Sequence, residues 1–212
     1  MPAHSIVDLI EESGVVAIIR RSAPFDAAGI AQALVAGGVR ALEITLNSHE
    51  ALRSIKMLQH LAIDGLVVGA GTVRTPADAR AALEAGARFL VAPNFDRATV
   101  DVAREAGVPM LPGVATPSEA VAAWQAGCEL LKFFPAAALG AQYLKLMRDP
   151  LDDIKFMVTG GVDSQNLQEF IRAGAVAVGA GSSLVGKGDE PADLITERAR
   201  ALIRAISEAR HV

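Results

Sequence analysis

The stretch EAGARFLVAP, residues 84–93, contains the complete passage from a helix into a buried strand and decides the fold. Ala85-Gly86 has the composition of a helix C-terminus, because glycine readily adopts the left-handed backbone conformation that ends many helices. The run RFLVAP that follows shows almost no alternation of polar and apolar residues, which is typical of a strand buried on both faces. This unit therefore predicts a strand inside a sheet that helices cover on either side.

The same unit recurs along the chain. Ala-Gly pairs at 36–37, 106–107, 126–127 and 173–174 also precede apolar runs, and amphipathic segments rich in Ala, Leu, Glu and Arg separate these runs. Segments of this length and composition are typical of the crossover helices that connect parallel strands. Thr75-Pro76 and Thr116-Pro117 have the pattern of helix starts. The eight apolar runs begin at Val15, Arg40, Leu66, Arg88, Pro109, Leu130, Lys155 and Ala175.

Eight strand-helix units in about 200 residues predict an α/β fold of the (β/α)₈ TIM-barrel type. An extra N-terminal helix is expected at about residues 2–13. A doubly wound open sheet is the alternative, although such sheets usually have fewer strands. Because no Pro/Ser-rich linker or low-complexity tract interrupts the pattern, we expect residues 1–212 to form a single domain.

The charge balance indicates small-molecule partners or further copies of the chain. Twenty Lys and Arg against 24 Asp and Glu give a net charge of −4 without a basic block, which argues against nucleic acid and an anionic membrane surface. The apolar runs are shorter than the roughly 18 residues of a membrane span, and the N-terminus lacks a signal-peptide pattern. The one cysteine, Cys128, cannot form an internal disulfide, so a cytoplasmic location is expected.

Two ionisable residues interrupt otherwise apolar strands, Glu43 in ALEITL and Lys132 in LLKFFP. A buried ammonium group must reach solvent, pair with a carboxylate, or become neutral through a lowered pKa, and a neutral amine is a nucleophile. Strand alternation places Glu43 on the same side as Thr45. If that side is the barrel interior, Glu43 and Lys132 share one mouth, either as a catalytic pair or as a structural ion pair.

Two glycine clusters follow the last two strands, TGG at 159–161 and GAGSS at 179–183. Either cluster alone could be a simple turn. Together they predict a phosphate site, because the loops after strands 7 and 8 of such barrels commonly bind phosphate through backbone N–H groups. With Lys132, this site predicts Schiff-base chemistry on a phosphorylated carbonyl compound. Metal chemistry is not expected, because the histidines lie away from the strand ends; they are His4, His49, His60 and His211.

The motifs LEIT, VGAGTV, LPGVAT, LKFFPA, TGGV and GAGSSL, in this order between about Gly14 and Gly186, resemble the class I bacterial aldolases that act on 2-keto-3-deoxy-6-phosphogluconate and on its galactonate epimer. The resemblance implies a homotrimer, and no cofactor is expected. It implies that Lys132 forms the Schiff base and that Glu43 is the general acid/base. Cleavage would then give pyruvate and glyceraldehyde 3-phosphate.

The resemblance also implies the remaining site residues. Asn47 departs from the gluconate-type pattern, which has an arginine there for the substrate carboxylate, and Arg20 could supply this charge as in the galactonate type. GAQYLKLM also resembles the galactonate type, whereas Thr159 and KFFPA resemble the gluconate type, and on these we predict the gluconate epimer as the main substrate. The implied substrate-binding residues are Arg20, Thr45, Asn47, Thr72, Pro93, Phe134 and Thr159, and those for phosphate are Gly160, Gly161, Gly181 and Ser182.

Several alternatives stay open at this point. The galactonate epimer, both epimers, or 4-hydroxy-2-oxoglutarate could be substrates. A phosphate-binding barrel could isomerise or bind a sugar phosphate without covalent chemistry, and an imine at Lys132 distinguishes the two. A noncatalytic assembly protein with this fold would not depend on Lys132 at all.

Overall fold

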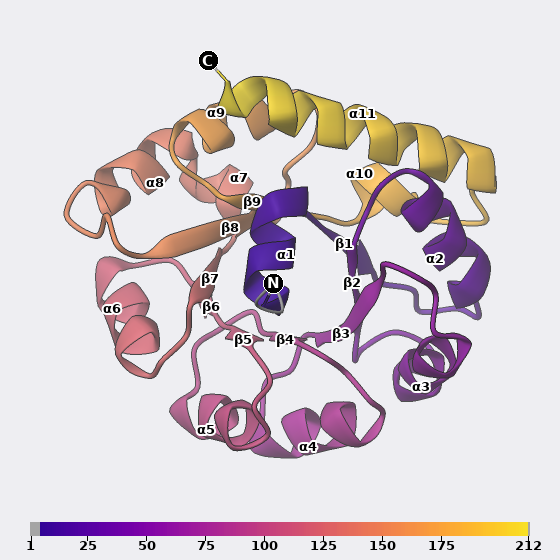
Figure 1. Ribbon diagram of the computed structural model, residues 1–212. Helices are drawn as coiled ribbons and strands as arrows, with labels where there is room; N and C mark the ends of the chain where they lie inside the picture. The colour runs from indigo at the N-terminus through magenta and orange to yellow at the C-terminus, as the bar shows by residue number, and fades with distance from the viewer. Residues whose placement is uncertain (1–4, 212) are drawn as a thin grey trace.

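The computed structural model describes residues 5–211 as a ring of parallel strands surrounded by a ring of helices (Figure 1). Within these residues nine strands form one sheet, and every pair of hydrogen-bonded neighbours is parallel. This confirms the predicted (β/α)₈ barrel. The order across the sheet is β5 (Met110–Leu111), β4 (Leu90–Val91), β3 (Val67–Gly71), β2 (Ala41–Thr45), β1 (Val15–Ile19), β9 (Ala177–Ala180), β8 (Lys155–Thr159), β7 (Leu130–Phe133) and β6 (Gly113–Val114).

The two strands at the ends of this order are halves of one expected strand. Pro112 separates β5 from β6, because proline has no N–H to donate to a strand ladder. Leu90 of β4 pairs with Met110 of β5, and Gly113 of β6 pairs with Lys132 of β7. Since the chain joins β5 to β6 directly, the barrel closes through this strand, and nine short strands correspond to eight expected ones.

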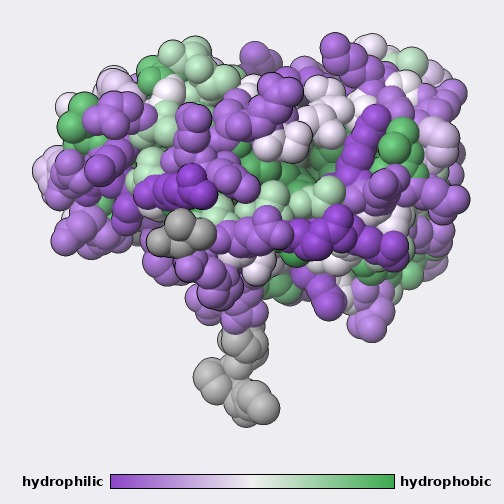
Figure 2. Space-filling view, turned by 90° about the horizontal axis from the view of Figure 1, so that it is seen from above, coloured by the Kyte–Doolittle hydropathy of each residue, from purple (hydrophilic) through white to green (hydrophobic). Residues whose placement is uncertain are grey.

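Helices surround the barrel and pack their apolar faces against it. They turn mainly charged and polar side chains outward, as the largely hydrophilic face in Figure 2 shows. None of the helices within residues 5–211 combines the length and the apolar character that a membrane crossing needs. The helices are α1 (Ile6–Ser13), α2 (Ala27–Ala36), α3 (Ala51–Leu61), α4 (Pro76–Glu84), α5 (Arg97–Glu105), α6 (Pro117–Gln125), α7 (Ala136–Leu139), α8 (Ala141–Arg148), α9 (Leu167–Arg172), α10 (Ser182–Val185) and α11 (Ala192–Arg210).

Glycine ends the helices largely as predicted. Gly86, Gly107, Gly127 and Gly174 all have the positive φ angles that favour glycine, each one residue after the last helical cap. The first Ala-Gly pair differs, because the left-handed residue there is Gly38 and Gly37 has a φ of −85°. Gly37 instead allows close packing, since a Cβ at this position would collide with Ala199 of α11.

The N-terminal helix closes one end of the barrel. The expected helix at 2–13 is observed as α1, capped by Ser5, while residues 2–4 lie outside the described residues. It lies across the opening of the barrel in Figure 1, and its Val7 and Ile10 pack against interior residues such as Phe89 and Leu130. The floor of the barrel is therefore filled with apolar side chains, and the C-terminal ends of the strands remain as the mouth.

The barrel interior makes room for a charged side chain. Alternation along β2 places Leu42 and Ile44 in the core between barrel and helices, while Glu43 points inward. The neighbouring strand β3 carries Gly71, where a Cβ would collide with the Glu43 carboxyl group. Because Gly71 has no side chain, the Glu43 carboxyl group can occupy the space beside β3.

Candidate active site

A cavity of about 420 Å³ opens at the mouth of the barrel, at the ends of β1, β7, β8 and β9. Strand ends from distant parts of the sequence meet here because all strands of the barrel are parallel. The cavity brings together eight of the predicted site residues, namely Arg20, Lys132, Phe134, Thr159, Gly160, Gly161, Gly181 and Ser182.

Lys132 is the buried amine of this cavity. It lies on β7 with only 4% of its surface exposed, and its Nζ atom is 5.0 Å from the centroid of the Phe134 ring. Burial lowers the pKa of Lys132, the positive charge of Arg20 lowers it further, and Glu43 opposes both effects. Burial is the largest cause, so the environment favours the neutral, nucleophilic amine.

Glu43 lies fully buried on β2, and its charge acts on Lys132. Neither carboxylate oxygen has a hydrogen-bond partner among residues 5–211, nor does any lysine or arginine there form an ion pair with it. Burial raises the pKa of Glu43, while Lys132 and Arg20 lower it less strongly. A direct structural ion pair is therefore not what holds the two groups, and Glu43 is free to exchange protons.

Thr159 presents a hydroxyl group at the end of β8. The residue is 4% exposed and lines the cavity, and its Oγ1 atom has no hydrogen-bond partner within the described chain. Gly179 on the neighbouring β9 provides the space, because a Cβ there would collide with the Thr159 side chain. An unpartnered buried hydroxyl costs free energy unless a ligand satisfies it. Thr159 is thus suited to hydrogen-bond a substrate.

The glycine clusters form another wall of the cavity. Gly160 and Gly161 have φ angles of 94° and 77°, and both carbonyl groups are occupied, by Ala137 N at 2.9 Å and Asn166 Nδ2 at 2.8 Å. Gly181 precedes the short helix α10, whose first N–H groups have no acceptor within the helix. This wall therefore offers backbone donors to an anion.

Five predicted site residues do not line this cavity: Glu43, which lies within β2, and Thr45, Asn47, Thr72 and Pro93, which lie at neighbouring strand ends. Thr45 is buried, with its Oγ1 3.0 Å from Ser48 Oγ, while Asn47 is exposed. Thr72 is half-buried and has a φ of 59°, which is rare for a β-branched residue and typical of functional sites. Pro93 is half-buried. Their roles remain predictions.

Two basic residues of the cavity were missed in the sequence, Arg21 and Lys187. The signal for Arg21 was the second arginine of IIRR directly after the first strand, but its hydrogen-bond partners lie more than 160 residues further along. Lys187 is exposed in a glycine-rich loop, where nothing in the local pattern distinguishes it from a solvent-exposed lysine.

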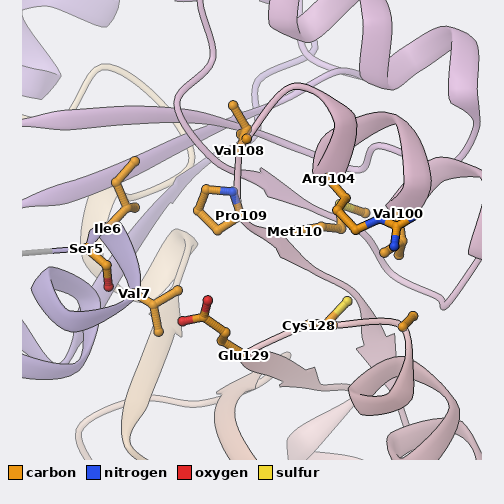
Figure 3. A pocket seen from close by; sticks show the side chains of 13 residues that line it. Ser5, Ile6, Val7, Val100, Arg104, Val108, Pro109, Met110, Cys128 and Glu129 are labelled. Carbon is orange, nitrogen blue, oxygen red and sulfur yellow. The ribbon is translucent and has the colours of Figure 1, made fainter.

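A second cavity, of about 490 Å³, lies at the opposite face between α1 and the ends of α5 and α6 (Figure 3). Its lining includes Arg104, Glu129 and Cys128, whose thiol pKa burial raises to about 11. A protonated thiol is a poor nucleophile. This cavity is the larger of the two, but its thiol is a poorer nucleophile than the Lys132 amine of the mouth cavity. Within residues 5–211, no three His, Cys, Asp or Glu side chains gather in a way that could hold a metal ion.

The mouth combines a buried lysine of lowered pKa with a glycine-rich wall, a combination typical of lysine-dependent (β/α)₈ enzymes. Comparison with known families then gives the particular one. The family described as "Aldolase: KDPG and KHG aldolase" matches residues 6–198, and the chain belongs to this family. The resemblance predicted from the sequence motifs, to aldolases acting on 2-keto-3-deoxy-6-phosphogluconate (KDPG), is thereby confirmed.

Individual relatives cover nearly the whole chain. A probable 2-dehydro-3-deoxy-6-phosphogalactonate aldolase of Rhizobium meliloti is 38% identical over 195 residues, which are 92% of each chain. A 2-dehydro-3-deoxy-phosphogluconate aldolase of Pseudomonas aeruginosa is 37% identical over 84% of this chain and 81% of its own. Among solved structures, KDPG aldolase from Legionella pneumophila, with pyruvate captured as a covalent carbinolamine, is 34% identical and has a TM-score of 0.83 over 92% of this chain and 96% of its own.

Proposed function

We propose that this protein is a class I aldolase that cleaves 2-keto-3-deoxy-6-phosphogluconate into pyruvate and glyceraldehyde 3-phosphate. The observation that carries the proposal is the placement of Lys132, a buried lysine with a lowered pKa on the wall of the mouth cavity. The gluconate- and galactonate-specific relatives and the pyruvate carbinolamine of the Legionella pneumophila enzyme support it.

The reaction begins with attack of the neutral Lys132 amine on the C2 carbonyl of the substrate. The resulting carbinolamine loses water to give an iminium, which withdraws electrons from the C3–C4 bond. A base then removes the proton of the C4 hydroxyl, the C3–C4 bond breaks, and its electron pair forms an enamine on Lys132 while glyceraldehyde 3-phosphate leaves. Protonation of the enamine at C3 and hydrolysis of the iminium release pyruvate and restore the amine.

Glu43 is the general acid and base of these steps. Burial raises its pKa and so favours the protonated carboxyl group, which can donate its proton to the leaving hydroxyl of the carbinolamine. The resulting carboxylate can then accept the C4 hydroxyl proton, directly or through water. Within residues 5–211 no donor group forms a hydrogen bond with its oxygens, so both oxygens remain available to accept this proton.

The two charged ends of the substrate find separate partners. We propose that Gly160, Gly161, Gly181 and Ser182 bind the phosphate through backbone N–H groups. Arg20 binds the carboxylate, assisted by Asn47, and Phe134 packs beside the imine. The polar residues Thr45 and Thr72 and the ring of Pro93 complete the pyruvyl end.

Thr159 supports a preference for the gluconate epimer. Its buried hydroxyl lines the cavity together with Lys132, where it can hydrogen-bond the C4 hydroxyl in one configuration. The galactonate epimer places that hydroxyl on the opposite side of C4. Because relatives of both specificities resemble the chain, both epimers are assayed side by side, and 4-hydroxy-2-oxoglutarate is included as the unphosphorylated substrate.

Borohydride reduction in the presence of pyruvate tests the proposal. Wild-type protein should gain one reduced pyruvyl group, which peptide mapping assigns to Lys132, and Lys132→Met should gain none. Lys155→Met is the matched control, because Lys155 begins the next strand at the opposite end and binds Glu11. An adduct on another lysine, or none on the wild type, would refute the covalent mechanism and favour a non-covalent sugar-phosphate barrel.

We further propose that the protein is a cytoplasmic homotrimer of one-domain chains spanning residues 1–212. Trp124 on α6 and Tyr143 and Leu146 on α8 support an interface, because these large apolar side chains are 45%, 36% and 60% exposed. Light scattering gives the number of chains directly. A monomer or dimer at micromolar concentration would contradict the trimer without affecting the aldolase proposal.

A further inference from the structure

Arg21 is a buried arginine next to the predicted substrate-binding Arg20, and it also lines the mouth cavity. We infer that Arg21 is a positioning residue that holds the loop 185–188 against the cavity and so confers recognition of the substrate phosphate. The inference rests on the proposed function, because it concerns the phosphate end of the same substrate.

The guanidinium group of Arg21 donates hydrogen bonds to backbone carbonyl groups. Its NH1 donates to the carbonyl of Gly186 at 2.6 Å, and NH2 donates to the carbonyls of Val185 at 2.7 Å and Gly188 at 3.2 Å. One side chain that follows β1 thereby holds the last carbonyl group of α10 and two carbonyl groups of the loop after it. The same loop carries Lys187 and borders the predicted phosphate-binding residues.

The guanidinium group of Arg21 also adds positive charge to the mouth cavity. Among residues 5–211 no carboxylate forms an ion pair with Arg21, so its hydrogen bonds go to neutral carbonyls and its positive charge is not compensated. Arg20 and Lys187 line the same cavity, where Asp163 is the one acidic lining residue in the described chain. This excess of positive charge fits a phosphate dianion better than a neutral sugar.

The backbone of Arg21 connects this loop to the strand of the catalytic acid. Its N–H donates to Ser48 Oγ at 3.1 Å, and its carbonyl accepts from His49 N–H at 2.6 Å. Ser48 Oγ in turn lies 3.0 Å from Thr45 Oγ1 on β2, two residues from Glu43. Arg21 therefore fixes the phosphate wall relative to the loop after β2, and with it the distance between the two ends of the substrate.

The test compares a phosphorylated with an unphosphorylated substrate. In Arg21→Met the KM for 2-keto-3-deoxy-6-phosphogluconate should rise about tenfold or more, because both a charge and the loop contacts are lost. The KM for 4-hydroxy-2-oxoglutarate should change less than about twofold, and so should the rate of borohydride trapping with pyruvate. Arg21→Lys should recover part of the loss, because an ammonium keeps the charge but not the planar array of donors.

Arg210→Met is the matched control. Arg210 also donates to three backbone carbonyls, of Glu11, Glu12 and Val176, but at the opposite end of the barrel. Its replacement should lower stability without changing the ratio of the two KM values. Hydrogen exchange should accelerate at residues 185–188 in Arg21→Met and remain as in the wild type in Arg210→Met.

The inference is wrong if Arg21→Met raises both KM values equally, or if Arg210→Met shows the same phosphate-selective loss. Binding of inorganic phosphate, followed by ³¹P line broadening, separates this failure from that of the proposed function. If the wild type forms no pyruvyl adduct but binds phosphate, and Arg21→Met binds it at least about tenfold more weakly, the role of Arg21 stands. Equal binding by both proteins, or no binding by the wild type, refutes it.

Discussion

Replacing Gly71 by alanine should disable proton transfer without removing any catalytic group. Gly71 ends β3 beside Glu43, and a Cβ there would lie 2.8 Å from the carboxyl carbon of Glu43 and 3.1 Å from Cγ2 of Thr45. Carbon atoms pack best at about 3.5 Å, so the carboxyl group must move by roughly 0.7 Å. Glu43 is fully buried, so this displacement changes its position relative to the reacting atoms.

Two magnitudes follow from this displacement. Overpacking costs about 1–3 kcal/mol of folding stability, which lowers the melting temperature by roughly 2–12 °C for a chain of this size. Misplacing an acid/base group by a large fraction of an ångström lowers kcat by about ten- to hundredfold. The pyruvate released can be coupled to NADH oxidation by lactate dehydrogenase. Borohydride trapping should still give an adduct, because the atoms nearest to the new Cβ belong to Glu43 and Thr45.

Gly69→Ala is the control for overpacking alone. Gly69 lies two residues earlier on the same inward face of β3, and a Cβ there would meet Phe89, at 2.6 Å from its carbonyl oxygen and 2.7 Å from its ring. This variant should lose comparable stability but keep kcat within about twofold of the wild-type value, since the atoms that the new Cβ would meet belong to Phe89 and not to the Glu43 carboxyl group. Equal kcat values in the wild type and Gly71→Ala, or equal losses in both alanine variants, would refute the proposed role of the Glu43 position.

Further predictions concern charge, specificity and the cysteine. The rate of borohydride trapping with pyruvate should rise with pH to a plateau, with a midpoint below pH 10.5, because burial lowers the pKa of Lys132. The midpoint should be higher in Arg20→Met, because Arg20 lowers this pKa, and lower in Glu43→Gln, because Glu43 raises it. Glu43→Gln should form the adduct slowly and lose cleavage activity by about 10²-fold or more, measured by pyruvate release. Thr159→Val should lower kcat/KM for the gluconate epimer by about tenfold while affecting the galactonate epimer less; equal losses on both would contradict its proposed role. Cys128, with a pKa of about 11, should react with iodoacetamide at pH 8 about 100-fold more slowly in the folded than in the urea-unfolded protein, and rapid labelling of folded protein would contradict its burial.

The barrel could be predicted because its units are local. Each apolar run, glycine turn and capping threonine acts within about ten residues, and Thr75 and Thr116 do form capping boxes with Asp78 and Glu119. The split of the fifth strand was not predicted, although Pro112 marks it in the sequence. The end of α2 could not be predicted to the residue, because the choice between Gly37 and Gly38 depends on packing against α11, which lies about 160 residues away in the sequence.

The site could be predicted in part. Lys132, Glu43 and Thr159 are polar residues within apolar strands, and the rule that parallel strands end at one mouth brings them together. Arg21 shows where this approach fails. Strand alternation predicts which way a residue points, but not that its guanidinium reaches a loop 165 residues later, because such contacts depend on the register between strands that are far apart in the sequence.

The unpaired state of Glu43 and Lys132 is itself an argument for function. Glu43 and Lys132 share one proton in either state, as a carboxylate with an ammonium or as a carboxylic acid with an amine. Which state is favoured depends on how deeply the two groups are buried and on whether they are in direct contact. Direct contact would favour a carboxylate and an ammonium, whereas burial without an ion pair within residues 5–211 shifts the pKa of Glu43 upward and that of Lys132 downward. Both shifts favour the neutral forms, a nucleophilic amine and a proton-donating carboxyl group, which are the two groups that carbinolamine formation and dehydration need. A site selected only for stability would have brought the two charges together or replaced them with apolar side chains.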